Sequence, residues 1–341
     1  STNWFNTGTV VCRNISLKSN FFNIDIDGET MLTDEESPVD LNYIAGQIKI
    51  GGAVNEGNVF ARGISIYQND SYSSYDTVST YFSIKNNKIG VDYNVQTSIP
   101  NSIGINAGTT DPNGTDTFNI EDNVIAGTLG GSINITNMGQ TITILRNYIG
   151  TDKTRTKAFK TQGIFLYWDT GQVAIGSTNP ADANYITNCN PVTVWPYTNC
   201  TINKNSFYCT VGQQPMHDPT LNGEFIYPDI KILNIAASSV SGTATPNSSI
   251  ELFYSDACKT CSPQTYFAST TADVNGNWTY NGPITGAVIA SATLGKNTSN
   301  FTQTTINTDS IKIINVCSNN GLGSIKGAIP TSASNIQWFN D

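Results

Sequence analysis

The stretch Thr141-Ile-Thr-Ile-Leu-Arg-Asn-Tyr-Ile-Gly-Thr-Asp152 contains a short pattern that returns along the chain. The pattern is an aliphatic residue, two variable residues, Asn, one variable residue and an apolar residue. Repeats spaced a few tens of residues apart indicate a solenoid, in which each unit buries its apolar face only against its neighbours. The recognisable copies are Ile144-x-x-Asn147-x-Ile149, Ile120-x-x-Asn123-x-Ile125, Ile84-x-x-Asn87-x-Ile89, Ile202-x-x-Asn205-x-Phe207 and, more loosely, Leu17-x-x-Asn20-x-Phe22.

A second phrase, a small residue followed by alternating apolar residues, lies between these copies. Its examples are Gly63-Ile-Ser-Ile66, Gly104-Ile105, Ser132-Ile-Asn-Ile135 and Gly163-Ile-Phe-Leu166. Both phrases are short, alternate with a period of two and are rich in Ile, Thr and Tyr, which predicts strands and not helices. One cycle, from Ile120 to Ile144, takes 24 residues, and the preceding cycle, from Ile84, takes 36. We therefore predict an all-β chain whose strands stack coil on coil as a parallel β-helix.

The asparagine at a fixed place in each copy has a physical reason to be there. Asn tolerates the left-handed conformation at a corner, and its side-chain amide can bond neighbouring backbone. Stacked amides on successive coils can also bond one another along the axis. We interpret Asn87, Asn123, Asn147 and Asn205 as a structural ladder, with a ligand-binding role as the alternative.

Composition and charge exclude several classes of protein. Charged residues make up 13% of the 341 residues, against roughly 25% in an average soluble domain. The net charge is −9 and the basic residues are scattered singly, which argues against a nucleic-acid partner. The sequence contains no run of 18 or more apolar residues, so it predicts no transmembrane segment. Because the chain opens at Ser1 without a signal peptide, we expect a processed product or a piece of a longer protein.

Seven cysteines and a single histidine bear on metal binding and redox state. Cys258-Lys-Thr-Cys261 could be a zinc half-site, but no second pair completes four ligands. We favour a local disulfide between Cys258 and Cys261 in an oxidising, extracellular setting. Another bridge could come from Cys189, Cys200 and Cys209, and the pairing of Cys12 and Cys317 stays open. We predict no metal and no cofactor.

The densest acidic cluster lies between residues 25 and 40. It comprises Asp25-Ile-Asp-Gly28, Asp34-Glu-Glu36 and Asp40, and its spacing does not match an EF-hand loop. We interpret it as a solvated acidic loop, with a calcium site as the alternative.

Aromatic residues follow two predicted strands at the points where the chain reaches the surface. They are Tyr167 and Trp168, next to Asp169, and Trp195 with Tyr197. A ring can stack on the apolar face of a sugar while nearby polar groups bind its hydroxyls, which predicts a carbohydrate-binding surface. As the alternative, these rings cap the open end of the solenoid or pack against the next domain.

From Asn134 to Asn188 the sequence becomes more specific. It contains Asn147-Tyr-Ile-Gly-Thr-Asp152, Gln162-Gly-Ile-Phe-Leu166 and Asn184-Tyr-Ile-Thr-Asn188. These phrases resemble the "N-x-I-G-T-D", "G-V-x-I" and "N-x-I-x-x-N" rungs of right-handed parallel β-helix repeats in secreted bacterial surface proteins. The resemblance covers residues 80–210 well, and it implies a right-handed parallel β-helix over residues 1–227.

The pattern changes at Pro228-Asp-Ile-Lys-Ile232. The following short alternating strands fit a small sandwich. The segments Gly242-Thr-Ala-Thr-Pro246, Asp273-Val-Asn-Gly-Asn-Trp278 and Asn297-Thr-Ser-Asn-Phe301 resemble bacterial Ig-like modules of repetitive surface proteins, which implies an Ig-like sandwich over residues 228–307. Gly321-Leu-Gly-Ser-Ile-Lys-Gly-Ala-Ile329 is similar to the capping segment that opens such β-helix domains, which implies a further module over residues 308–341.

Two classes of function fit this organisation. The resemblance implies an adhesive or structural repeat of a giant extracellular protein on a bacterial cell surface, of the gliding-motility and biofilm adhesin type. Its partners would be neighbouring modules of the same chain and surface glycans or polysaccharide. The alternative is a polysaccharide lyase or glycoside hydrolase with an accessory sandwich, since fold alone does not fix function.

The residues argue against catalysis. A hydrolase needs carboxylates that converge on one face, whereas Glu121, Asp122 and Asp152 read as lone acids in turns. Arg146 is explained by stacking on a neighbouring coil, and His217 by a position in a linker. We predict no catalytic residues and no enzyme activity.

Overall fold

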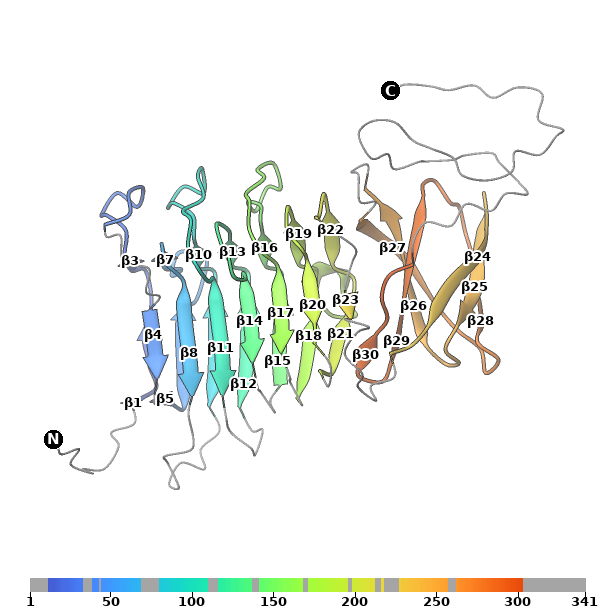
Figure 1. The fold of residues 1–341 in the computed structure, drawn as a ribbon, viewed down its shortest axis with the longest axis horizontal. Helices are drawn as coiled ribbons and strands as arrows, with labels where there is room; N and C mark the ends of the chain where they lie inside the picture. Colours follow the sequence, from blue (N-terminus) through green and yellow to red (C-terminus); the bar gives the residue numbers. More distant parts are fainter. Residues whose placement is uncertain are drawn as a thin grey trace.

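The computed structural model describes residues 12–32, 39–42, 44–68, 80–109, 116–136, 141–167, 171–195, 198–211, 216–217, 227–256 and 262–302. Within these residues the regular structure is β, apart from the short 3-10 helix η2 (Pro180–Asp182). Figure 1 shows a long stack of parallel strands followed by a separate antiparallel unit. No helix in these ranges has the length and apolar character needed to cross a bilayer.

Three parallel sheets of seven strands each make up the stack, and the chain visits them in turn. The first sheet comprises β2 (Ser16–Leu17), β6 (Gln47–Gly51), β9 (Tyr81–Lys85), β12 (Thr117–Glu121), β15 (Thr141–Leu145), β18 (Gln172–Ile175) and β21 (Cys200–Ile202). The second comprises β3 (Phe21–Phe22), β7 (Val59–Phe60), β10 (Lys88–Ile89), β13 (Val124–Ile125), β16 (Tyr148–Ile149), β19 (Tyr185–Thr187) and β22 (Ser206–Tyr208). The third comprises β4 (Val39–Asn42), β8 (Ile64–Gln68), β11 (Ile105–Thr109), β14 (Ile133–Thr136), β17 (Ile164–Tyr167), β20 (Val192–Val194) and β23 (Met216–His217). A small pair, β1 (Cys12–Arg13) and β5 (Ile44–Ala45), lies at the N-terminal end.

The register between coils is the one that the repeat predicts. Ile120 pairs with Ile84 on one side and with Ile144 on the other, so cycles of 36 and 24 residues bring the same position back to the same place. Extra residues in the longer cycles lie between strands and leave the pairing unchanged. The all-β class and the parallel β-helix are confirmed.

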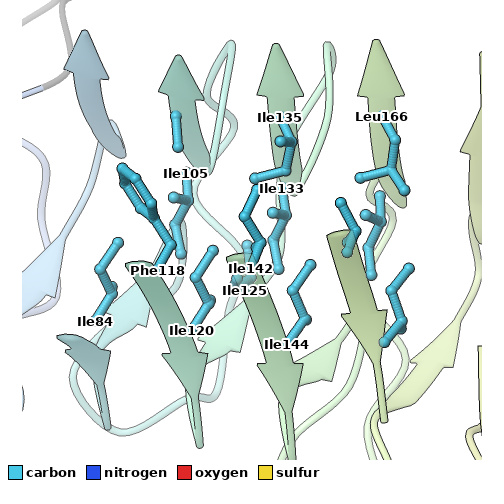
Figure 2. Close-up of a cluster of buried hydrophobic side chains, with 14 of the residues drawn as sticks. Ile84, Ile105, Phe118, Ile120, Ile125, Ile133, Ile135, Ile142, Ile144 and Leu166 are labelled. Carbon is cyan, nitrogen blue, oxygen red and sulfur yellow. The ribbon is translucent and has the colours of Figure 1, made fainter. Parts of the chain in front are cut away.

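Apolar side chains from the three sheets fill the interior in continuous stacks. Ile84, Ile120 and Ile144 are fully buried, and Figure 2 shows them beside the side chains of the other two sheets. Phe82 and Phe118 stack on adjacent coils with ring centroids 4.0 Å apart. Each such side chain contributes roughly 1.5–3 kcal/mol on burial. Because every coil repeats the same inward positions, the core runs along the axis.

The corner between the first and second sheets differs in one detail from the expectation. The left-handed conformation belongs to the residue before the ladder asparagine, with φ of 58° at Asn86, 58° at Asp122, 54° at Arg146 and 53° at Lys204. The following asparagine uses its side chain to bond the adjacent coils. The residue before the asparagine thus adopts the left-handed backbone conformation of the corner, and the asparagine itself provides the side-chain hydrogen bonds.

His217 lies in the last strand of the third sheet and not in a linker. Its backbone pairs with Val194 of β20, so the segment Met216–His217 continues the solenoid. The expectation of a linker there is wrong because the neighbouring strand edge offers backbone partners to a short extended segment.

The antiparallel unit is a sandwich of two sheets. The first is ordered β24 (Ile230–Ala236), β25 (Ser239–Ala244) and β28 (Asn277–Asn281). The second is ordered β27 (Pro263–Thr271), β26 (Ser249–Ser255), β29 (Val288–Leu294) and β30 (Asn297–Thr298). This order corresponds to strands A, B and E of an immunoglobulin-type sandwich facing C′, C, F and G. Trp278 is buried in its core, at 2% exposure.

The sandwich docks on the last coil of the β-helix, with β30 against β21 and β27 against β22. Its side chains accept hydrogen bonds from backbone N–H groups of that coil. In interior coils the equivalent N–H groups bond a carbonyl of the next coil: Arg146 N, for example, donates to the Asp182 carbonyl at 3.2 Å. The corresponding bonds at the end run from Cys200 N to Asn297 Oδ1 (3.3 Å), Ile202 N to Thr298 Oγ1 (2.9 Å), Lys204 N to Glu251 Oε2 (2.9 Å) and Cys209 N to Asp256 Oδ2 (2.6 Å).

Phe301 covers the apolar end of the solenoid. Its ring centroid lies 5.9 Å from that of Phe207 in the last coil and 5.4 Å from that of Phe253 in the sandwich. The sandwich therefore provides both polar caps and an apolar cover, which a solenoid end requires to avoid exposing strand edges and core. The segment 308–341 lies outside the described residues.

Candidate functional site

The predicted asparagines lie in one file along the corner between the first and second sheets. Asn123 Nδ2 donates to Asn147 Oδ1 at 3.0 Å, and the backbone N–H of Asn123 donates to the same oxygen at 3.1 Å. Asn147 Nδ2 in turn donates to the Ile120 carbonyl at 2.8 Å. Each buried amide thus satisfies backbone groups of two coils, which is a structural task.

The file is longer than the sequence pattern indicated. Asn58 and Asn184 belong to it: Asn58 Nδ2 donates to Asn87 Oδ1 at 2.9 Å, and Asn147 Nδ2 donates to Asn184 Oδ1 at 3.0 Å. Its members are Asn20, Asn58, Asn87, Asn123, Asn147, Asn184 and Asn205.

Tyr167 is the last residue of β17, and Trp195 directly follows β20, the adjacent strand of the third sheet. Leu166 pairs with Val194 and both are buried in the core, and Trp195 N continues the ladder by donating to the Leu166 carbonyl at 2.9 Å, so the residue after each of the two points outward. The ring centroids of Tyr167 and Trp195 are 5.2 Å apart, with planes tilted by 49°. Both side chains are half-buried, and desolvation raises the pKa of Tyr167.

This pair is the part of the predicted carbohydrate-binding surface that the structure describes. Trp168, Asp169 and Tyr197 lie outside the described residues. Phe165, the preceding outward residue of β17, lies parallel to Tyr167 with centroids 6.1 Å apart. The three rings give the outer face of the third sheet an aromatic area. The ring that covers the end of the solenoid is Phe301, from the sandwich.

Glu121 and Asp122 are not lone acids, contrary to expectation. Both bind Arg146 of the next coil, at 2.7 Å and 3.0 Å, and Lys85 lies 3.3 Å from Glu121. Arg146 also binds Asp182 at 2.6 Å, so three carboxylates, from the coils on either side, converge on one guanidinium. Stacking of coils brings these residues together at the same corner, which their separation in sequence conceals. Arg146 therefore acts through ion pairs.

Three acids, Asp25, Asp92 and Asp152, each close a loop between the second and third sheets. Asp152 Oδ1 accepts from the N–H groups of Thr156 and Lys157, both at 2.9 Å. Asp25 and Asp92 accept from the equivalent positions of their own loops. The loops after β3, β10 and β16 project from the same edge in Figure 1.

Hydrogen bonding explains the pKa of these acids. Desolvation opposes ionisation of Asp152, but bonds from Thr154, Lys157 and Thr156 outweigh it and lower its pKa. Backbone bonds from Glu29 and Thr30 lower the pKa of Asp25. In the predicted acidic loop, the Asp25 carboxylate thus bonds the backbone of its own turn, and Asp34-Glu-Glu36 lie outside the described residues. No group of three or more His, Cys, Asp or Glu side chains in the described ranges could hold a metal ion.

The cysteines differ from one expectation. Cys189 is a free, buried thiol whose pKa is raised by desolvation, and Cys200 Sγ donates to the Thr201 carbonyl at 3.8 Å. The prediction of a disulfide among Cys189, Cys200 and Cys209 is therefore wrong. Cys209 is disulfide-bonded, to a partner outside the described residues. Cys258 and Cys261 also lie outside them, and their pairing stays a prediction.

A cleft at the junction of the two domains was not predicted from the sequence. Its volume is about 440 Å³, and it lies between the loop after β16, strands β19 and β22, and strand β27 of the sandwich. Arg155 and Lys204 line it together with Tyr185, Tyr208 and Tyr266. These residues are up to 111 positions apart in the chain, so no local motif could have indicated them.

Comparison with known proteins adds no relative: no family model, no curated protein and no solved structure matches this chain.

Proposed function

We propose that this chain is an adhesive and load-bearing module of a long bacterial cell-surface protein, held outside the cell and attaching it to polysaccharide. The observation that carries the proposal is the outward Tyr167–Trp195 pair on the side of the β-helix. An aromatic pair on a rigid sheet suits the apolar face of a sugar. Weak contacts of this kind gain strength when a module is repeated along a chain.

The docked sandwich supports the load-bearing part. Side-chain caps and Phe301 join the last coil to the sandwich, so force along the axis passes from stacked strands into a second folded unit. This arrangement suits a stalk in which β-helices and sandwiches follow one another. Neighbouring modules and surface glycans are the partners that it implies.

Retention on immobilised polysaccharides tests the proposal. Tyr167→Ala and Trp195→Ala should abolish retention and lower the free energy of unfolding by no more than about 1 kcal/mol, the usual size of a cross-strand aromatic contact. The matched control is Tyr81→Ala, since Tyr81 is an exposed tyrosine on the first sheet, and retention should survive it. Unchanged retention in both test variants would contradict the platform, and a large loss of stability would identify the rings as core.

The enzyme reading rests on the convergence of Glu121, Asp122 and Asp182. A glycoside hydrolase needs a carboxyl whose pKa is raised, so that it can donate a proton. The pKa of Asp182 is instead lowered, by the Ser177 hydroxyl and by Arg146. Incubation with acidic and neutral polysaccharides, followed by assays of reducing ends and of unsaturated products, decides between the two classes. Shorter products that disappear in Glu121→Gln would support the enzyme.

A further inference from the structure

The cleft between the β-helix and the sandwich brings two cations together on an acidic chain. Lys204 occupies the corner before the last ladder asparagine, and Arg155 occupies the turn of the Asp152 loop. The chain carries 17 basic residues and a net charge of −9, so a cavity lined by two cations differs in the sign of its charge from the chain as a whole. At physiological salt, charges beyond about 8 Å are largely screened, and the local pair dominates what the cleft attracts.

Neither cation forms an ion pair with a carboxylate among the described residues. The Arg155 guanidinium lies over the Tyr185 ring, 4.7 Å from its centroid, and Lys204 Nζ lies 4.5 Å from the Tyr266 centroid. Lys204 Nζ also donates to the Thr178 carbonyl at 2.6 Å. Contacts with rings and a carbonyl hold the two side chains in place, and neither cation is neutralised by a direct ion pair, although the charge of Lys204 acts on the buried Glu251 carboxyl.

The remaining lining is mostly aromatic and polar. Tyr185 and Tyr266 contribute phenol groups, Tyr208 contributes its ring, and Gln264 adds a side-chain amide. Tyr148 stacks on Tyr185 with centroids 5.3 Å apart, which fixes that ring. A volume of about 440 Å³ lies within the range of small-molecule pockets, and pockets at domain junctions are common. Hydroxyls and amides suit sugar hydroxyls, while the cations require an anionic substituent.

We infer that this cleft binds a sugar residue that carries a carboxylate or a sulfate, with Arg155 and Lys204 as the anion-binding side chains. The inference rests on the proposed attachment to polysaccharide and names the class of polysaccharide. Both domains contribute to the site: the β-helix supplies the cations, and the sandwich supplies Tyr266 and Gln264. It follows that the site exists only while the domains are docked.

Titration calorimetry of the full chain tests the inference with defined probes at 0.15 M salt. These are a hyaluronan tetrasaccharide, its carboxyl-reduced neutral counterpart and a chondroitin sulfate tetrasaccharide. We expect at least one anionic probe to bind and the neutral counterpart to bind at least tenfold more weakly. The double variant Arg155→Gln and Lys204→Gln should lower the affinity for the anionic probe at least tenfold. The control Lys296→Gln replaces an exposed lysine in the turn before β30 and should leave this affinity unchanged.

Equal affinity for the neutral and anionic probes, or unchanged affinity in the double variant, would overturn the inference. So would the absence of binding to both anionic probes. Retention of the wild-type chain on a neutral polysaccharide through Tyr167 and Trp195 would then leave the proposed function standing. A circular dichroism melt of the double variant shows whether weaker binding reflects unfolding, and Arg155→Lys, which keeps the charge, should retain part of the affinity.

Discussion

The side chain of Glu251 accepts a hydrogen bond from the backbone N–H of Lys204 at 2.9 Å, in the place where a further coil would offer a carbonyl. At the same corner of earlier coils, Asp122 N donates to the Leu145 carbonyl at 3.1 Å and Arg146 N to the Asp182 carbonyl at 3.2 Å. A carboxylate of the sandwich thus substitutes for a peptide oxygen of the solenoid. The docking surface imitates the next coil in polar pattern, and Phe301 continues its apolar filling.

Removal of the Phe301 ring should weaken the domain junction. Phe301→Ala deletes the side chain that touches Phe207 and Phe253, so we expect a loss of roughly 2–4 kcal/mol in the free energy of unfolding. We also expect calorimetry to resolve two transitions, because the β-helix and the sandwich lose their coupling. Leu233→Ala, at an exposed position of β24, is the control and should change stability by less than about 0.5 kcal/mol. A single transition at the wild-type temperature would contradict this role.

Interruption of the asparagine file should be costly at its centre. Asn147→Ala leaves the buried Asn123 N–H and the Ile120 carbonyl without the partners that Asn147 provides, and each loss costs about 1–3 kcal/mol. We expect urea unfolding to show a decrease of roughly 2–5 kcal/mol. Asn94→Ala, at an exposed loop position, should fall within about 0.5 kcal/mol of wild type. Equal free energies of unfolding for the two variants would mean that the asparagine file contributes nothing to stability.

Regular spacing made most of this file predictable, and irregular spacing concealed the rest. In five coils the asparagine follows the inward aliphatic residue by three positions, which is a recognisable motif. Asn58 follows Ile50 by eight positions and Asn184 follows Ile175 by nine, because these corners contain insertions. Insertions at a corner leave the strand register intact, so the fold tolerates them although the pattern is lost.

Side chains that act across the domain junction could not be predicted in the same way. The segment Asn297-Thr298-Ser299 is recognisable as part of an Ig-like module, but its hydrogen-bond partners Cys200 and Ile202 lie 97 and 96 residues earlier. Arg155 and Tyr266 likewise line one cleft only because the domains dock. Sequence patterns report periodicity within one unit, and they carry no information on which surface of the next unit it faces.

Peptide mapping under non-reducing conditions should identify the partner of Cys209. Cys209 N donates to Asp256 at 2.6 Å, and Thr210 Oγ1 lies 2.8 Å from the Ser262 hydroxyl, so Cys209 adjoins both ends of the segment 257–261. We expect a cross-linked peptide that contains Cys209 and either Cys258 or Cys261. Recovery of a Cys258–Cys261 loop peptide, with Cys209 joined to Cys317, would instead support the local disulfide predicted from the sequence.

The buried carboxyl of Glu251 should make the stability of the protein dependent on pH. Desolvation raises its pKa to about 7 from 4.5, although the Lys204 N–H and the charge of Lys204 oppose the shift. Below pH 4.5 the group is protonated in both the folded and the unfolded chain and has no effect. Between about pH 4.5 and 7 the unfolded chain loses this proton first, so stability falls as pH rises, and above pH 7 the loss is complete.

Glu251→Gln should remove this dependence, because an amide oxygen can still accept from Lys204 N and carries no charge. At about 1.4 kcal/mol per pKa unit, ionisation of Glu251 lowers the free energy of unfolding by roughly 3 kcal/mol between low and high pH. We expect the variant to be more stable than wild type by about 1–3 kcal/mol at pH 8 and nearly equal at pH 4, measured by urea unfolding at both values. Glu29→Gln, at an exposed loop position, should leave the pH profile unchanged. Parallel profiles for wild type and Glu251→Gln would show that Glu251 ionises at the junction without cost, so that its role there would be that of an ordinary surface acid.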